Sequence, residues 1–140
     1  MATTHNTFLE IAKESVEKDG EHWVRNAISR AYYCMFHAAQ RLTDGTAPTQ
    51  DAQGQPLRGG THQRFSDYLC DGQAAKDYGL DAIELKKIGL RLKTAHHKRV
   101  VSDYHLERKV NKIDARMTIL DAENMSNEID CMLSGKENVG

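Results

Sequence analysis

The chain has 140 residues, a length that suits a single domain. Its 19 Lys and Arg residues against 20 Asp and Glu residues give a formal net charge of −1, so the protein is not a polycation and any nucleic-acid site must be a local patch. No apolar run approaches the roughly 20 residues that a membrane span needs, and the first residues lack the pattern of a signal peptide.

Helical periodicity dominates the chain, and no segment alternates like a strand. The first helix is expected to begin at Thr7, which has capping-box spacing with Glu10, and to end at Gly20. The second helix is expected over residues 21–42. Within it, the stretch SRAYYCMFHAAQ, residues 29–40, is apolar around most of its circumference. We therefore predict that this helix is the central element, buried by neighbouring helices and by a second subunit.

Both prolines fall in residues 43–60, a loop long enough to be functional or disordered. A short helix capped by Thr61 is expected after this loop. Another helix should begin near Asp81, which has capping-box spacing with Glu84.

The last long helix is predicted to start at Ser102 or Asp103, either of which is a suitable N-cap. Its inward face is expected to carry an apolar seam. The seam residues are Leu106, Val110, Ile113, Met117 and Leu120. This helix should run to Leu133, with residues 134–140 as a disordered tail. The pattern predicts an all-α fold with a single domain over residues 1–133, an antiparallel bundle of four main helices plus a short helix.

Three cysteines, Cys34, Cys70 and Cys131, match neither a disulfide framework nor zinc-ligand spacing. This usage predicts a cytoplasmic location. His96 and His97 are adjacent and point in different directions, so they make a poor metal pair, and no metal or other cofactor is expected.

Basic residues gather in one part of the chain. No acidic residue occurs between Leu85 and Ser102. We predict that this interval and the segment after it supply the RNA-binding residues. They are Lys86, Lys87, Lys93, Lys98, Arg108 and Lys109. A long interval without acids favours a surface that meets phosphate, although a solvated helix face gives the same pattern.

The segment KRVVSDYHLERK, residues 98–109, contains the residues that we predict to be catalytic. A helix starting in this segment favours an anion at its N-terminus. There Arg99 can grip a phosphate at two points, and His105 can move a proton near neutral pH. These groups are the minimum for cleaving RNA by attack of a ribose 2′-hydroxyl on its own phosphate, without a metal. The supporting residues are Ser102, Asp103 and Tyr104.

A structural interpretation stays open, in which Arg99 pairs with Asp103 and His105 caps a helix or is exposed. Arg91 with either His96 or His97 has a similar spacing to the preferred pair. They lie within one continuous helix, however, where five positions correspond to about 140° of rotation and separate the two groups.

Three further side chains are weaker candidates. His62 follows the expected cap Thr61 and is expected only to lie at the start of a helix, without a functional role. Tyr32 and Tyr33 are expected to lie in the core or in an interface.

Several sequence pieces, in this order, resemble the HEPN domain family. They are NAISRAYYCMFHAAQRL with its adjacent tyrosines, a glycine-bearing loop, THQRFSDYL with its T-H start, and RVVSDY in the pattern R-x-x-x-D-Y. The resemblance covers about residues 5–133 and implies a helical bundle that dimerises. It also implies a metal-independent ribonuclease with an R-x(4–6)-H motif in two copies that face each other across the dimer. Arg99 and His105 match this motif.

Proteins of this family act as toxins or phage-defence effectors, often beside a nucleotidyltransferase antitoxin. The resemblance therefore implies a homodimer, RNA and an antitoxin of that type as partners. This chain departs from the common toxin branch of the family at Val100 and Leu106, the residues that follow Arg99 and His105. The alternative is a catalytically inactive HEPN module that binds RNA, a nucleotide or a partner protein. A third hypothesis is a structural dimer with a solvated basic surface.

Overall fold

The computed structural model describes residues 3–45 and 47–139, and of residues 136–139 only the backbone. Within this part the chain forms six α-helices and no β-strand, which confirms the all-α prediction. The helices are α1 (His5–Val16), α2 (Glu21–Gln40), α3 (Thr61–Cys70), α4 (Gln73–Tyr78), α5 (Ala82–Tyr104) and α6 (Lys112–Val139). A short 3-10 helix, η1 (Arg41–Thr43), extends α2. None of the described helices combines the length and the apolar content of a membrane span.

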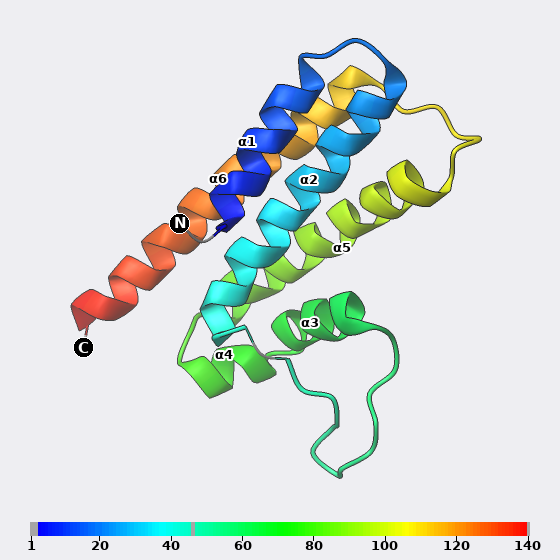
Figure 1. Ribbon diagram of the computed structural model, residues 1–140. Coiled ribbons are helices and arrows are strands. Elements are labelled where there is room, and N and C mark those ends of the chain that lie inside the picture. The colour runs from blue at the N-terminus through cyan, green and yellow to red at the C-terminus, as the bar shows by residue number, and fades with distance from the viewer. Residues whose placement is uncertain (1–2, 46, 140) are drawn as a thin grey trace.

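The central helix is α2, which packs against α1, α5 and α6 (Figure 1). α1 and α5 run in one direction along the bundle, and α2 and α6 run in the other. α3 packs against α5 near the end of α2, and the short α4 lies beside α3. The four long helices were predicted, whereas α4 was not.

The sequence of α2 explains its central position. Of its 20 residues, 11 are buried. Tyr32, Met35 and Phe36 are 0%, 1% and 6% exposed, and neighbours from the same chain cover them. The predicted central role of α2 is therefore confirmed, but this surface does not need a second subunit to bury it.

The helix starts agree with the predicted caps in part. Asp81 caps α5 as predicted, because its carboxylate accepts a hydrogen bond from the Glu84 N–H at 2.9 Å. α1 begins at His5 and not at Thr7, because the capping box forms between Thr4 and Thr7.

The loop before α3 has internal structure in the described residues 47–60. The Asp51 carboxylate accepts hydrogen bonds from the N–H groups of Gln53 and Gln55, both at 2.9 Å. The Leu57 N–H donates to the Thr49 carbonyl at 2.9 Å, so the loop folds back on itself below α3 (Figure 1). Thr61, predicted as a cap, is the first residue of α3.

The largest difference from the sequence prediction is the boundary between α5 and α6. α5 continues through Ser102 and Asp103, so the predicted helix start at these residues is wrong. Both side chains are engaged by the tertiary structure, since Ser102 is buried and Asp103 contacts other side chains. α6 begins after Asn111, whose side chain accepts a hydrogen bond from the Asp114 N–H at 2.9 Å.

The C-terminal end of α5 is held by Arg25 of α2, whose side chain is 11% exposed. The Arg25 guanidinium donates hydrogen bonds to five backbone carbonyl oxygens. They belong to Val101, Ser102, His105, Leu106 and Arg108. The last carbonyls of a helix lack partners within it and carry its partial negative charge, so a largely buried cation donates the missing hydrogen bonds and offsets that charge.

The buried face of α6 also differs from the predicted seam. Leu106, Ile113, Met117 and Leu120 are 73%, 69%, 56% and 56% exposed, so their inward placement is wrong. The buried stripe instead mixes small, polar and apolar side chains. It consists of Ala115, Thr118, Ile119, Ala122, Met125, Ser126 and Ile129. Thr118 is buried at low cost because its hydroxyl donates to the Asp114 carbonyl at 2.8 Å.

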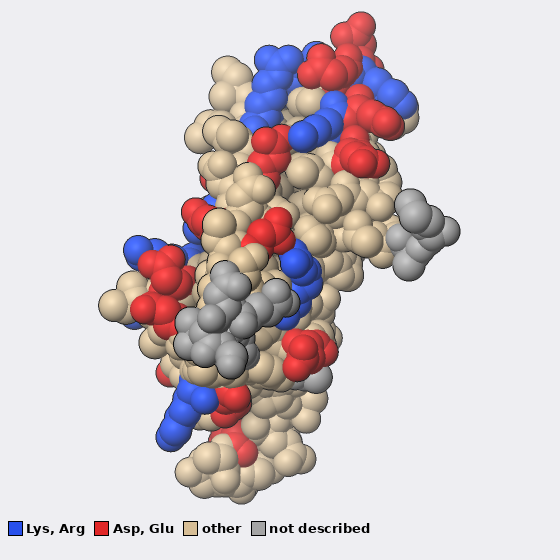
Figure 2. All heavy atoms as spheres, turned by 90° about the vertical axis from the view of Figure 1, so that its left-hand side faces the viewer, with Lys and Arg blue, Asp and Glu red and all other residues tan. Residues whose placement is uncertain are grey.

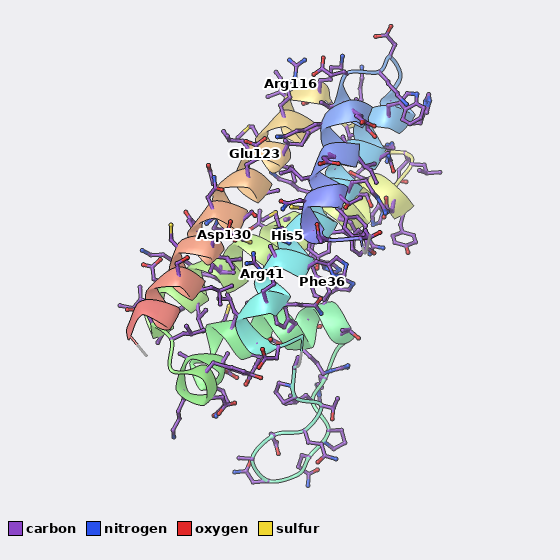
Figure 3. All side chains as sticks on the ribbon, turned by 60° about the vertical axis from the view of Figure 1, so that its left-hand side comes forward. His5, Phe36, Arg41, Arg116, Glu123 and Asp130 are labelled. Carbon is purple, nitrogen blue, oxygen red and sulfur yellow. The ribbon has the colours of Figure 1, made fainter. Side chains whose placement is uncertain are left out.

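Polar contacts fix α6 against α1 and η1. Arg41 pairs with Asp130 at 2.7 Å (Figure 3). The His5 ring nitrogen Nε2 lies 3.1 Å from the Ser126 hydroxyl. Beyond these contacts α6 continues through Val139, into the segment that was expected to be disordered.

Gly89 allows α5 to approach α3 closely. A Cβ atom at this position would lie 2.5 Å from Cys70 Sγ and 3.0 Å from the Ser66 carbonyl oxygen. We expect Gly89→Ala to lower the free energy of unfolding by about 1–2 kcal/mol, because overpacking outweighs the gain in helix propensity. Gly135→Ala is the matched control in α6, where the added Cβ meets nothing within 4 Å. Denaturant unfolding measures both, and equal stability of the two variants would contradict this account.

Candidate functional site

Side chains from α2, α3 and α5 meet in one cluster of aromatic and polar groups. We call it the tyrosine–histidine cluster. Its members are Tyr32, Tyr33, His62, His96 and Arg99. Phe36, labelled in Figure 3, packs beside it with its ring centroid 4.4 Å from that of His62. Three pieces of the family resemblance that are far apart in the chain meet here. They are the tyrosine pair, the T-H start that contains His62, and the arginine of R-x-x-x-D-Y, Arg99.

Arg99 is the cation of this cluster, and its side chain is 15% exposed. Its Nη2 donates to the Tyr33 hydroxyl at 2.8 Å, and its Nε lies 2.9 Å from the Asp103 carboxylate in an ion pair. The guanidinium carbon lies 5.3 Å from the Tyr33 ring centre and 5.5 Å from that of Tyr104. Ser29 donates a further hydrogen bond to Asp103 at 3.2 Å. The pairing of Arg99 with Asp103 is thus present, and it fixes the orientation of the guanidinium.

His62 and His96 stack beside Arg99, with ring centroids 5.0 Å apart. His62 Nδ1 lies 2.5 Å from the Tyr32 hydroxyl oxygen. Burial, followed by the nearby charges of His96 and Arg99, lowers the pKa of His62 to about 4. Burial and Arg99 also lower the pKa of His96. Both imidazoles are therefore neutral at pH 7 and can accept a proton.

Acidification should destabilise the fold through His62. Between pH 6.5 and about 4 the unfolded chain binds a proton at His62 that the folded chain excludes, so the free energy of unfolding falls as the pH falls through this window. His5 and His96 act in the same direction, because burial lowers the pKa of each. Denaturant unfolding at both ends of the window should show a smaller loss for His62→Gln than for the wild type. Equal losses would show that His62 does not contribute.

His105 does not join the tyrosine–histidine cluster. It is the C-cap of α5, its carbonyl accepts a hydrogen bond from Arg25, and its Nδ1 lies 3.3 Å from the Glu107 carboxylate. Arg99 and His105 are six positions apart, which corresponds to about 240° of rotation on a helix. The two side chains therefore point in different directions, as was argued from the sequence for Arg91 and His96. They also have different partners.

The supporting residues have separate roles. Ser102 is 2% exposed and belongs to the core, whereas Tyr104 is 67% exposed and lies against the Arg99 guanidinium. Asp103 connects α5 to α2 through Ser29. Two of the three, Asp103 and Tyr104, therefore contact the candidate site.

The basic residues predicted to bind RNA are partly neutralised by acids. Besides Arg99, three basic residues of α5 form ion pairs, two of them with other helices. The pairs are Lys87–Glu84, Lys93–Asp67 and Arg91–Glu128. Lys86, Arg108 and Lys109 are exposed. α3 and α6 therefore supply acids that the sequence interval lacks, and two of the six predicted residues, Lys87 and Lys93, have a carboxylate partner.

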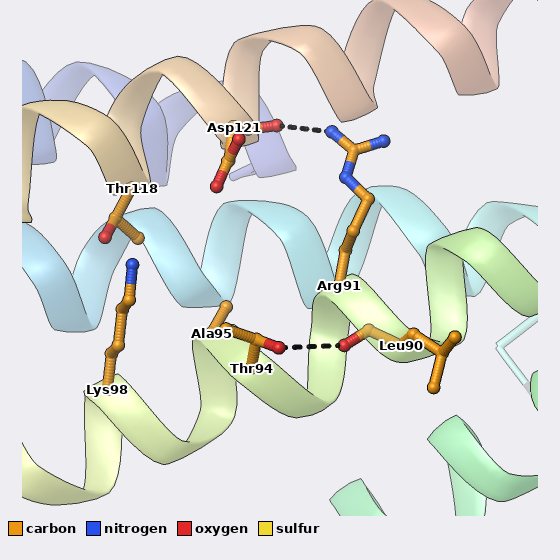
Figure 4. A pocket seen from close by; sticks show the side chains of 7 residues that line it. All are labelled: Leu90, Arg91, Thr94, Ala95, Lys98, Thr118 and Asp121. Carbon is orange, nitrogen blue, oxygen red and sulfur yellow. Dashed lines mark hydrogen bonds between the residues drawn. The ribbon is translucent and has the colours of Figure 1, made fainter.

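Lys98 points into a cavity of about 200 Å³ between α5 and α6 (Figure 4). Thr118 and Asp121 line it from α6, and Arg91 donates to the Asp121 carbonyl at 3.3 Å. On the face shown in Figure 2, acidic and basic side chains are interspersed.

Sequence reasoning singled out Arg99 but set aside the residues around it. Tyr32 is fully buried, as expected for a core residue, yet its hydroxyl lies against His62. Tyr33 does more than pack in the core, because its hydroxyl accepts a hydrogen bond from Arg99. The signal that could have found these residues was the set of motif pieces that carried the family resemblance.

No family model matches this chain, and comparisons with curated proteins and with solved structures likewise find no match. In the described part of the chain, no group of three His, Cys, Asp or Glu residues is placed to hold a metal ion.

Proposed function

We propose that the protein is a metal-independent endoribonuclease of the HEPN type that cleaves single-stranded RNA at the tyrosine–histidine cluster. The observation that supports this proposal is one fixed guanidinium, Arg99, beside two neutral imidazoles, His62 and His96. A guanidinium binds phosphate and a neutral imidazole takes a proton, so one site holds both kinds of group that the reaction needs.

The proposed step needs no group from outside the site. When His62 donates its Nδ1–H to the Tyr32 oxygen, its Nε2 keeps a lone pair and takes the proton of the ribose 2′-hydroxyl. The 2′-oxygen then bonds to phosphorus, and the bond from phosphorus to the 5′-oxygen breaks. The bound phosphate anion counteracts the burial and the Arg99 charge that lower the pKa of His96, so His96 takes up a proton from solvent and gives it to the leaving oxygen. Arg99 stabilises the charge on the non-bridging oxygens.

Digestion of single-stranded RNA in the presence of EDTA tests this function. The products should carry a 2′,3′-cyclic phosphate and a 5′-hydroxyl, and DNA should stay intact because it lacks the 2′-hydroxyl. If none of the RNAs tested is cleaved, the catalytic proposal is refuted.

A catalytically inactive HEPN module that binds RNA is the second candidate. It is favoured by the internal partners of Arg99, because Asp103 already compensates its charge, and by the separation of His105 from Arg99. RNA binding without cleavage would support this candidate.

A homodimer belongs to the same proposal, together with a toxin or phage-defence role, a nucleotidyltransferase-type antitoxin and a cytoplasmic location. The surface around Tyr32 that motivated a dimer from sequence is buried, but Ile113, Met117 and Leu120 of α6 are exposed. Light scattering at micromolar concentration should give twice the chain mass of 15.8 kDa. Met117→Glu should lower the measured mass if this face forms the interface. A wild-type monomer would refute the dimer.

A further inference from the structure

A second guanidinium, that of Arg30, lies beside the tyrosine–histidine cluster. Its Nη2 donates to the Ser29 hydroxyl at 3.4 Å, and its carbon lies 5.1 Å from the Tyr33 ring centre and 5.8 Å from that of Phe8. Its Nε is buried and has no hydrogen-bond partner in the described part of the chain. Among the described residues Arg30 has no acidic partner, whereas the charge of Arg99 is compensated by Asp103.

Arg30 and Arg99 approach the same aromatic ring. Their guanidinium carbons lie 5.1 Å and 5.3 Å from the Tyr33 ring centre. The ring attracts each cation, but the two cations repel each other, so negative charge placed beside each guanidinium stabilises the arrangement. A strand of RNA offers negative charges at regular intervals, each of which a guanidinium can bind.

We propose that Arg30 binds a second phosphate, next to the one held by Arg99. The site then takes a single strand with at least two consecutive phosphates and binds a single phosphodiester more weakly. This inference rests on RNA as the ligand of the proposed function, but it does not depend on cleavage.

Binding of 2′-O-methyl oligonucleotides tests it, because their blocked 2′-oxygen prevents cleavage. A trinucleoside with two phosphates should bind the wild type more tightly than a dinucleoside with one. Its plot of log affinity against log salt should be steeper by roughly 0.7, the contribution of one phosphate contact on a single strand. Arg30→Gln should remove this increment, so that the trinucleoside binds no more tightly than the dinucleoside and has the same salt dependence. Arg30→Lys should keep most of the salt dependence, because it retains the charge.

Arg64→Gln is the matched control. Arg64 also has a buried Nε without a partner, but its Nη1 donates to the Gly59 carbonyl at 2.8 Å, outside the cluster. This variant should bind both oligonucleotides as the wild type does.

Two results would overturn the inference. One is a wild type that gains nothing from the second phosphate. The other is an Arg30→Gln variant that weakens both oligonucleotides equally, which would make Arg30 a structural residue only. If the increment is present but unmodified RNA is not cleaved, the proposed catalysis fails and the second phosphate site stands.

Discussion

Arg99→Ala should lower the cleavage of single-stranded RNA by on the order of a hundredfold or more. The developing charge on the phosphate loses its main donor, and in a site shielded from water such a loss has effects of this size. The measurement is the initial cleavage rate in EDTA, with circular dichroism to show that each variant is folded. Arg99→Lys should recover little activity, because an ammonium cannot replace the two-point grip of a guanidinium.

Histidine variants decide between the two possible positions of the proton-transfer group. His62→Ala and His96→Ala should each lose on the order of a hundredfold, the usual effect of removing an acid–base group. His105→Ala should keep most of the activity, because His105 faces Glu107 and not Arg99. Loss of activity in His105→Ala alone would restore the pair predicted from sequence and refute the role of the cluster histidines.

Arg25→Ala should destabilise the fold by about 3 kcal/mol, since it leaves several backbone carbonyls at the end of α5 without a charged donor. The Arg25 side chain is nearly buried, so water replaces these hydrogen bonds poorly. Denaturant unfolding measures the loss.

Arg41→Ala provides the control for this stability effect. Arg41 pairs with Asp130 at 2.7 Å, but its side chain is 37% exposed, so its removal should cost less than about 1 kcal/mol. If both variants lose the same free energy, Arg25 is not the residue that fixes the end of α5.

The features that the sequence could predict depend on local patterns. The apolar circumference of α2 and the Asp81 cap of α5 are visible in neighbouring residues, and both predictions are confirmed. The boundary of α5 could not be found in this way. Ser102 and Asp103 have the composition of an N-cap, but burial and contacts with Ser29 and Arg99 keep them inside a helix.

The burial of α6 shows a second limit of local patterns. The apolar residues at helical spacing, such as Ile113 and Met117, are exposed, while Thr118 and Ala122 face the core. Apolar character alone selects the wrong face here, because the helix is buried through small residues and through a hydroxyl bonded to its own backbone. The candidate site was hidden for a related reason, since His62 and Tyr33 acquire partners only through tertiary contacts.

The separation of the cluster residues along the chain has a consequence for how the protein folds. Tyr32 meets His62 across 30 positions, and Tyr33 meets Arg99 across 66. Contacts of this range form only after the intervening chain has closed into a loop, and they slow folding relative to local helix contacts. The isolated helices can form early, but the hydrogen bond from Arg99 to Tyr33 does not exist until α5 has docked on α2, and the stacked imidazoles do not exist until α3 has docked on α5. A chain still emerging from the ribosome before residue 99 therefore carries no assembled site, and any nuclease activity would appear only with the complete bundle.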